Sequence, residues 1–205
     1  MKTKIQKNRV ELIKEICSNF YNGSGVEVGT FKGEFSKEIL VSWSGKLYMV
    51  DVWRDLSEEY QDCSNHKFFE TNLYDETIKN IDEFGDRAIM IRSTSESASQ
   101  IFNNNSLDFV YIDANHSYEF VKQDIELWYP KIKNGGYILG HDYLDIEWYK
   151  DPNFAENGKD KHIWNGTFYH GLFGVNPAVD EFCDNFGYNL TITSEWFGTW
   201  MIKKN

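Results

Sequence analysis

The sequence predicts a three-layer α/β domain built on a mostly parallel, seven-stranded sheet whose last strand is antiparallel. Three observations lead to this fold class. Short apolar segments alternate along the chain with amphipathic segments of helical period, which is typical of βαβ units. Residues 107–113 (LDFVYID) are apolar enough to form a strand buried on both faces. Glycine and other turn residues follow the ends of the expected strands.

The expected elements follow in chain order. Strands are predicted over these ranges: 25–29, 46–51, 88–92, 107–113, 137–140, 188–194 and 196–203, the last two pairing antiparallel. Helices are predicted over 8–21 (within an N-terminal helical segment, 1–22), the later part of 53–85, and the ranges 33–44, 117–132 and 176–186. Residues 143–172 lack periodicity and are the predicted substrate lid, because long irregular segments in compact domains are often functional. A single domain over 1–205 is expected.

Composition limits the classes of function. The 205 residues are 41% hydrophobic and 17% aromatic, enough for a buried core, and the net charge is −11. That charge argues against nucleic acid as a partner. Three scattered cysteines fit neither a disulfide framework nor a metal clip. With no apolar run of membrane length and no signal-peptide pattern, we expect a cytoplasmic protein without a membrane partner. The sequence neither indicates nor excludes a homo-oligomer.

The turn after the first expected strand is suited to a ligand. Gly25, Gly29 and Gly33 are spaced four apart, which is not the dinucleotide-binding G-x-G-x-x-G pattern. Glu27, inside the strand, suits an ammonium group better than a pyrophosphate. Asp51 follows Gly29 by 22 residues and closes the next strand, where a carboxylate can accept two ribose hydroxyls. These features together predict a nucleoside site, although glycines that merely end a strand remain an alternative.

The chain resembles a known family at this point. Val26–Gly33 (VEVGTFKG), Asp51 and the block 107–118 (LDFVYIDANHSY) are similar to the class I S-adenosylmethionine-dependent methyltransferases. The segments 128–136 (WYPKIKNGG) and 140–143 (GHDY) are similar to a subgroup that includes small-molecule and sugar O-methyltransferases. The resemblance covers about residues 24–143 and implies a Rossmann-like methyltransferase fold with S-adenosyl-L-methionine as cofactor.

The resemblance also implies roles for individual residues. Glu27 would hold the methionine ammonium, and Asp51 would hold the ribose hydroxyls. Trp53 would lie against the adenine, and Asp113 would face the methyl-transfer centre. The residues expected to bind the cofactor are Glu27, Gly29, Thr30, Gly33, Asp51, Val52, Trp53, Ser93, Thr94, Ser95 and Asp113.

A second group of residues predicts the chemistry. Asp113 ends one expected strand, His116 follows it, and His141 and Asp142 end the next strand. Neighbouring strands lie about 4.8 Å apart, so these side chains are expected to converge and to be catalytic. Asp113, His141 and Asp142 make a candidate site for a divalent metal such as Mg²⁺, as in related metal-dependent O-methyltransferases. Having His141 first departs from the usual pair there and favours a metal that accepts imidazole. Each of these residues also has a purely structural alternative, such as a helix cap.

The acceptor is predicted only by class. We expect His116, Tyr143, Trp164 and His170 to contact a small hydroxylated molecule, with a sugar or sugar nucleotide as one candidate. The predicted activity is therefore S-adenosylmethionine-dependent O-methyl transfer, assisted by a metal together with a histidine base, although the sequence does not separate the two ways of making the hydroxyl nucleophilic. The alternatives are a metal-independent N-methyltransferase of a small amine, a nicotinamide-dependent oxidoreductase, and a non-catalytic nucleoside-binding domain.

Overall fold

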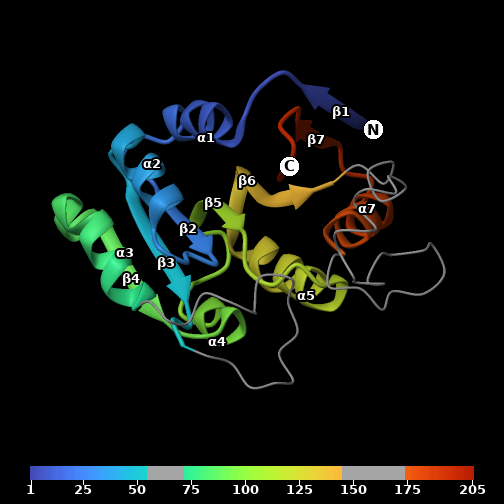
Figure 1. Cartoon of the computed structure of the whole chain (residues 1–205). Helices are drawn as coiled ribbons and strands as arrows, with labels where there is room; N and C mark the ends of the chain where they lie inside the picture. Colours follow the sequence, from blue (N-terminus) through green and yellow to red (C-terminus); the bar gives the residue numbers. More distant parts are fainter. Residues whose placement is uncertain (55–71, 145–173) are drawn as a thin grey trace.

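The computed structural model describes residues 1–54, 72–144 and 174–205. Within them lies one sheet of eight strands in the order β1-β7-β8-β6-β5-β2-β3-β4 (Figure 1). The strands are β1 (Lys2–Ile5), β2 (Ser24–Val28), β3 (Lys46–Asp51), β4 (Ala88–Arg92), β5 (Leu107–Ile112), β6 (Ile132–Tyr143), β7 (Leu190–Thr193) and β8 (Gly198–Lys203). The helices are α1 (Arg9–Ser18), α2 (Glu34–Ser42), α3 (Leu73–Ile81), α4 (Ser95–Ser99), α5 (Tyr118–Trp128) and α7 (Val175–Phe186), with short 3-10 helices at Asp82–Arg87 and Tyr129–Lys131.

The sheet confirms the predicted fold class. Strands β4, β3, β2, β5 and β6 are parallel to one another, and β8 runs antiparallel to both β6 and β7. All six residues of β5 are buried, as its apolar sequence predicts for a strand at the centre of a covered sheet.

The strand count differs from the prediction by one. Residues 2–5 form an edge strand, β1, which pairs parallel with β7, so the sheet has eight strands within the described residues rather than seven. The predicted N-terminal helical segment is correspondingly too long. Helix α1 begins only at Arg9, where the side chain of Asn8 caps the Glu11 amide and Glu11 caps the Asn8 amide in return. That capping box fixes the boundary, and the helical period of the preceding residues does not override it.

Helices cover both faces of the sheet, which gives the predicted three layers. On one face, the core joins Ile13 of α1 and Ile39 of α2 to Phe109 of β5. On the other face, Ile125 of α5 and Val179 of α7 pack with the strands. Helices α1 and α2 thus lie opposite α5 and α7 in Figure 1. Both layers leave the carboxyl ends of the parallel strands at one edge, where an α/β sheet binds ligands.

Strand β6 is longer than predicted. It spans Ile132–Tyr143, so His141 and Asp142 lie within it rather than after it. The pairing with β8 shifts here, from Gly140 opposite Trp200 to Tyr143 opposite Gly198. Two residues of β6 therefore face one residue of β8, which is a β-bulge, a feature that often redirects side chains next to active sites.

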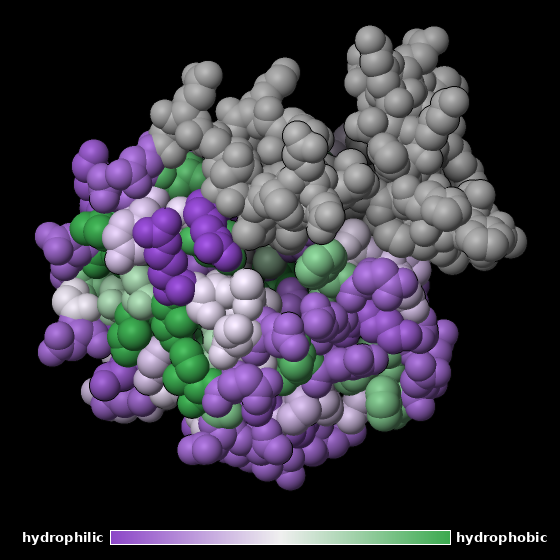
Figure 2. Space-filling model, turned by 90° about the horizontal axis from the view of Figure 1, so that it is seen from below, coloured by the Kyte–Doolittle hydropathy of each residue, from purple (hydrophilic) through white to green (hydrophobic). Residues whose placement is uncertain are grey.

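The surface mixes polar and apolar side chains. In Figure 2, hydrophilic side chains occupy much of the face seen from below, and hydrophobic side chains lie in patches between them. No helix among residues 1–54, 72–144 and 174–205 is both long enough and apolar enough to cross a membrane.

Candidate functional site at the carboxyl ends of the strands

Three strands end together at the candidate site. The amide of Gly29, just after β2, donates to the Val50 carbonyl of β3 at 2.8 Å, and the amide of Asp113, just after β5, donates to the Val28 carbonyl at 2.7 Å. These bonds keep the turn after β2 level with the ends of β3 and β5. The ends of the strands that carry Asp51 and Asp113 therefore lie on either side of the glycine turn.

Gly29 is required by close packing. Its φ is +91°, and a Cβ there would lie 2.0 Å from the Asp113 carbonyl oxygen. Gly33, with φ +75°, similarly makes room for the Thr77 side chain, 3.0 Å from its Cβ position. Both glycines thus serve the fold as well as the predicted ligand. Beside Gly29, the hydroxyl oxygen of Thr30 is buried and has no hydrogen-bond partner among the described residues. An unmet buried hydroxyl on this turn fits a site made for a polar ligand.

Glu27 is buried next to the turn. Its side chain is 2% exposed and accepts a short hydrogen bond from the Ser36 hydroxyl of α2. The pKa of Glu27 is raised to about 8, chiefly by burial and also by the negative charges of Asp113 and Asp51, while the Ser36 hydrogen bond and Arg9 oppose the rise. A carboxylate in such surroundings is stabilised by an arriving cation, which supports the predicted ammonium contact.

Asp51 is held by the main chain. Its carboxylate accepts hydrogen bonds from the amide of Phe31 at 2.8 Å and from the amide of Trp53 at 2.9 Å. Burial raises the pKa of Asp51 and these amide bonds oppose that change. Phe31 and Trp53 have φ values of +54° and +40°, a costly conformation for residues with a side chain, and such strain gathers at functional sites.

Trp53 has a different environment from the one predicted. Its ring is 6% exposed, and its Nε1 donates to the Phe31 carbonyl at 2.9 Å and to the Thr77 hydroxyl at 3.1 Å. The indole therefore packs on α3 and presents little surface to an adenine. The neighbouring Val52 carbonyl accepts from Arg92 Nε at 3.2 Å. Sequence spacing predicted the position of Trp53 but not the side on which its ring lies.

The segment after β4 is anchored at both ends. The Ser93 amide donates to the Asp51 carbonyl at 2.9 Å, which places this segment beside β3 as predicted. Thr94 caps α4 through the Ser97 amide. The Ser95 hydroxyl bonds to buried Asp124 of α5 and accepts from Trp128 Nε1 at 2.8 Å. The Thr94 and Ser95 side chains are thus already engaged within the protein.

The histidines and Asp142 converge as predicted. His116 Nε2 lies 2.7 Å from Asp142 Oδ2 and 3.6 Å from Asp113 Oδ1, and His141 Nδ1 lies 3.3 Å from Asp142 Oδ1. The bulge in β6 makes this possible, because Asp142 has a φ of +60° and its carboxylate turns back towards His141. Burial would raise the pKa of Asp142, but hydrogen bonds from the two imidazoles dominate and hold it well below its ordinary value.

Arg9 joins the site and was not predicted. Its Nη1 lies 3.4 Å from Asp113 Oδ2, and its guanidinium lies over the Phe35 ring at 4.6 Å. It is the first residue of α1, where a cation opposes the helix dipole. That unfavourable placement was the one signal in the sequence that Arg9 has a role outside its helix. The sequence does not show, however, that α1 begins beside β5.

The predicted metal ligands form a cluster. Asp113, His141 and Asp142 each offer one ligand atom, and these atoms lie within 4.8 Å of one another. This spacing and the mixed oxygen and nitrogen donors fit one divalent ion of the kind that accepts imidazole. They fit Mg²⁺ less well, since it prefers oxygen ligands. Arg9, which lies 3.4 Å from Asp113, already balances part of the negative charge.

The predicted acceptor residues are only partly described. Tyr143 is 7% exposed, and its hydroxyl donates to Asp180 Oδ1 at 2.7 Å and contacts Lys2 Nζ. Its phenol thus points towards α7 and β1 rather than into the histidine cluster. Trp164, His170 and nearly all of the predicted lid lie outside the described residues.

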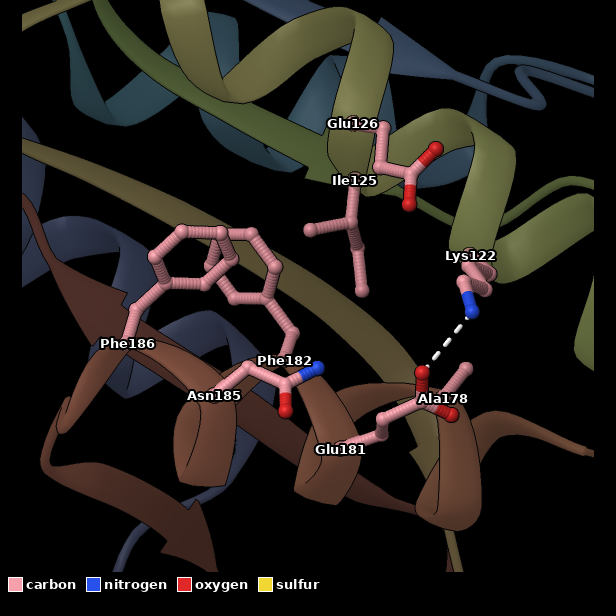
Figure 3. Close-up of a pocket in the computed structure, with 8 residues that line it drawn as sticks. All are labelled: Lys122, Ile125, Glu126, Ala178, Glu181, Phe182, Asn185 and Phe186. Carbon is pink, nitrogen blue, oxygen red and sulfur yellow. Dashed lines mark hydrogen bonds and ion pairs between the residues drawn. The ribbon is translucent and has the colours of Figure 1, made fainter.

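A surface hollow lies elsewhere, between α5 and α7 (Figure 3). Its lining includes Phe182 and Phe186 at one end and the ion pair of Lys122 Nζ with Glu181 Oε1, 2.8 Å apart, at the other. It runs along two helices rather than across the strand ends. Its charged pair is exposed, so we assign no chemistry to it.

Known proteins resemble this chain in both sequence and fold. A family model described as a methyltransferase domain matches residues 26–143, more than half of the chain. An uncharacterized protein of Acanthamoeba polyphaga mimivirus is 35% identical over 82 residues, which are 38% of this chain and only 37% of that protein.

Two solved structures share the fold. One is a candidate caffeoyl-CoA O-methyltransferase from Staphylococcus aureus, with a TM-score of 0.66 and 15% identity over 97% of this chain and 84% of that one. The other is an O-methyltransferase from Bacillus cereus in complex with S-adenosylhomocysteine, with a TM-score of 0.61 and 13% identity over 98% of this chain and 82% of that one.

Proposed function

The chain belongs to the methyltransferase-domain family, of the class I fold, and from this premise we propose that it transfers a methyl group from S-adenosylmethionine to a hydroxyl of a small acceptor. One observation carries the proposal beyond the family. An imidazole–carboxylate pair, His116 with Asp142 at 2.7 Å, lies at the same sheet edge as the Asp51 carboxylate. A nucleoside-binding domain without catalytic activity has no need of such a pair.

The residues of the β2 and β3 ends fit the cofactor. Both oxygens of Asp51 lie at the end of β3, where they can accept ribose hydroxyls while the two amides hold them in place. Buried Glu27 gains from a cation, and the Thr30 hydroxyl lacks a partner among the described residues. When bound, S-adenosylmethionine supplies an electrophilic methyl group on a sulfonium.

His116 is the proposed general base. An alcohol must lose its proton as it attacks, and a positioned imidazole accelerates such a step by about 10²- to 10⁴-fold. Asp142 Oδ2 lies 2.7 Å from His116 Nε2, so Asp142 orients the ring and stabilises it once the proton has arrived. His141 contacts the other oxygen of Asp142 and thereby fixes the carboxylate.

Asp113, His141 and Asp142 would hold a divalent metal if one takes part. Such an ion would lower the pKa of a bound acceptor hydroxyl and orient a diol. The imidazole donor makes a transition metal such as Zn²⁺ a better candidate than Mg²⁺. The acceptor itself is proposed as a small hydroxylated molecule, with a sugar or sugar nucleotide among the candidates, and not a nucleic acid, because the net charge is −11.

Transfer of a labelled methyl group tests this function. Wild type is incubated with methyl-labelled S-adenosylmethionine and panels of small diols, sugars, sugar nucleotides and amines, first with Mn²⁺ or Mg²⁺ and then with chelator. We expect label on a hydroxylated acceptor. Label only on amines, with no effect of chelator, would favour the N-methyltransferase alternative. The non-catalytic alternative would be favoured if the cofactor binds but no acceptor is labelled, even when a cell metabolite extract is added.

A further inference from the structure

We propose that Arg9 binds the carboxylate at the amino acid end of the cofactor, while Glu27 binds the ammonium of the same end. This inference rests on the proposed function, because it names the partner of one charged group of S-adenosylmethionine. It assigns a binding role to a residue that neither the motifs nor the family match includes, since the matched region begins at residue 26.

The local structure delivers Arg9 to the site in a defined orientation. The capping box of Asn8 and Glu11 fixes the first turn of α1, so the backbone of Arg9 is constrained. The Phe35 ring lies 4.6 Å from the guanidinium carbon and supports the side chain from one face. Because a cation at a helix N-terminus opposes the helix dipole, α1 gains nothing from Arg9. The placement is explained if Arg9 acts on charged groups at the ends of the strands rather than on its own helix.

The charges around the turn call for a cation. Glu27, Asp51 and Asp113 lie around it, and the charges of Asp113 and Asp51 both act on Glu27. A free amino acid end carries a carboxylate as well as an ammonium. That carboxylate would be repelled by the Asp51 and Asp113 carboxylates unless a positive group met it. Arg9 is charged at any working pH and interacts electrostatically with both Glu27 and Asp113, so it stands beside the group that takes the ammonium.

The guanidinium bonds to Tyr111 and contacts Asp113, and these contacts use only part of its five donors. Its contact with Asp113 is 3.4 Å, longer than the 2.7–2.9 Å typical of a charged hydrogen bond. The side chain is 34% exposed, so it is neither sealed in the core nor loose in solvent. With five N–H donors, Arg9 can hold a ligand carboxylate with one edge and stay close to Asp113 with the other.

Two ligands that differ only at the amino acid end test the proposal. S-adenosylhomocysteine carries the carboxylate and ammonium, whereas 5′-methylthioadenosine lacks both. We expect Arg9→Ala to weaken binding of S-adenosylhomocysteine by about 10- to 100-fold and to leave binding of 5′-methylthioadenosine within about twofold, as measured by calorimetry. Arg9→Lys should restore part of the loss, because it keeps the charge but not the two-pronged geometry.

Lys14→Ala is the matched control, since Lys14 is an exposed cation on the same helix, and it should change neither affinity. Equal weakening of both ligands by Arg9→Ala would overturn the proposal and make Arg9 a positioning residue for Asp113. Unchanged affinity for S-adenosylhomocysteine would also overturn it. If wild type binds neither ligand, the proposed function fails as well, and that result is distinct from the other two. Binding of 5′-methylthioadenosine to Arg9→Ala also shows that the variant is folded.

Discussion

Asp51 and Asp142 lie at the same edge of one sheet, yet their carboxylates are held by different kinds of partner. Asp51 accepts hydrogen bonds from the backbone amides of Phe31 and Trp53. Asp142 lies between two imidazoles, those of His116 and His141. Amides keep their protons and their positions, whereas imidazoles titrate near neutral pH and can exchange partners.

The difference separates binding from chemistry. The end of β3 is fixed by the main chain and suits a ligand that must be held in one orientation. The ends of β5 and β6 are joined by side chains that can take up or release a proton, as acceptor activation requires. Gly29 is the point at which the two parts touch, because its missing side chain makes room for the backbone of Asp113.

The largest effect is expected from Asp142→Asn, which keeps the shape and removes the charge that orients His116. The rate of methyl transfer should fall by about 10²- to 10⁴-fold, the range for loss of general acid–base catalysis. Affinity for S-adenosylhomocysteine should stay within about twofold. Asp184→Asn, at an exposed position of α7, is the control. If the rate of methyl transfer and the affinity for S-adenosylhomocysteine fell together, the end of β3 and the ends of β5 and β6 would not have separate roles in binding and chemistry.

Gly29→Ala tests the contact between the parts. The new methyl group would lie 2.0 Å from the Asp113 carbonyl oxygen at a φ of +91°. We expect the free energy of unfolding in urea to fall by about 3 kcal/mol or more, from overpacking and backbone strain together. Gly187→Ala shares a positive φ, +70°, but meets nothing within 4 Å. It should cost about 1–2 kcal/mol. Equal costs would show that the close approach at Gly29 does not matter.

Asp51→Ala is expected to act on binding rather than on the chemical step. Loss of this charged hydrogen-bond acceptor should weaken the binding of S-adenosylhomocysteine by about 2 kcal/mol, or roughly 30-fold in the dissociation constant. A titration followed by tryptophan fluorescence measures this dissociation constant. At saturating cofactor, the rate of methyl transfer by the variant should return to that of wild type. Asp86→Ala, at an exposed position before β4, serves as control. An unchanged dissociation constant would exclude Asp51 from the ribose role.

Asp124→Asn should have the smallest effect on binding and methyl transfer, and it should instead change the pH dependence of stability. Burial raises the pKa of Asp124 from 3.8 to about 7, although the Ser95 hydrogen bond opposes this. Between these values the folded protein keeps a proton that the unfolded chain has lost. The contribution of Asp124 to the free energy of unfolding should therefore fall as pH rises from 4 to 7, by about 1 kcal/mol per pH unit, and then level off.

Removing the titrating group should flatten this slope. Urea unfolding at several pH values compares Asp124→Asn with wild type and with Glu126→Gln, an exposed position on the same helix. If Asp124→Asn and wild type keep parallel slopes, the Asp124 carboxyl is not protonated in the folded protein at pH 5.

The sequence predicted what depends on local pattern. The parallel strands, the glycine turn and the place of Asp51 follow from apolar runs and turn residues along β2 and β3. The meeting of Asp113 with His141 and Asp142 followed from strand ends sharing one edge. The extra strand β1 could not be predicted in this way, because four mostly exposed residues gain their pairing only from β7, almost two hundred positions away.

Other details depend on contacts that no local pattern contains. The bulge at His141 and Asp142 arises from the register of β8 on β6. The burial of the Trp53 ring depends on Thr77 of α3. Arg9 reaches Asp113 only because α1 packs beside β5, 104 residues away in the chain. Residues on which the predicted lid falls, including Trp164 and His170, stay predictions.

Calorimetric titration of S-adenosylhomocysteine into wild type, first with chelator and then with Mn²⁺, tests the central claim most directly. The proposed function predicts one site per chain with a micromolar dissociation constant, and saturation should also protect the protein against unfolding. An increment on adding Mn²⁺ would show that a metal takes part in binding, as expected if Asp113, His141 and Asp142 hold one. The absence of any binding heat, together with an unchanged unfolding midpoint at millimolar ligand, would contradict the account and leave the glycine turn with a purely structural role.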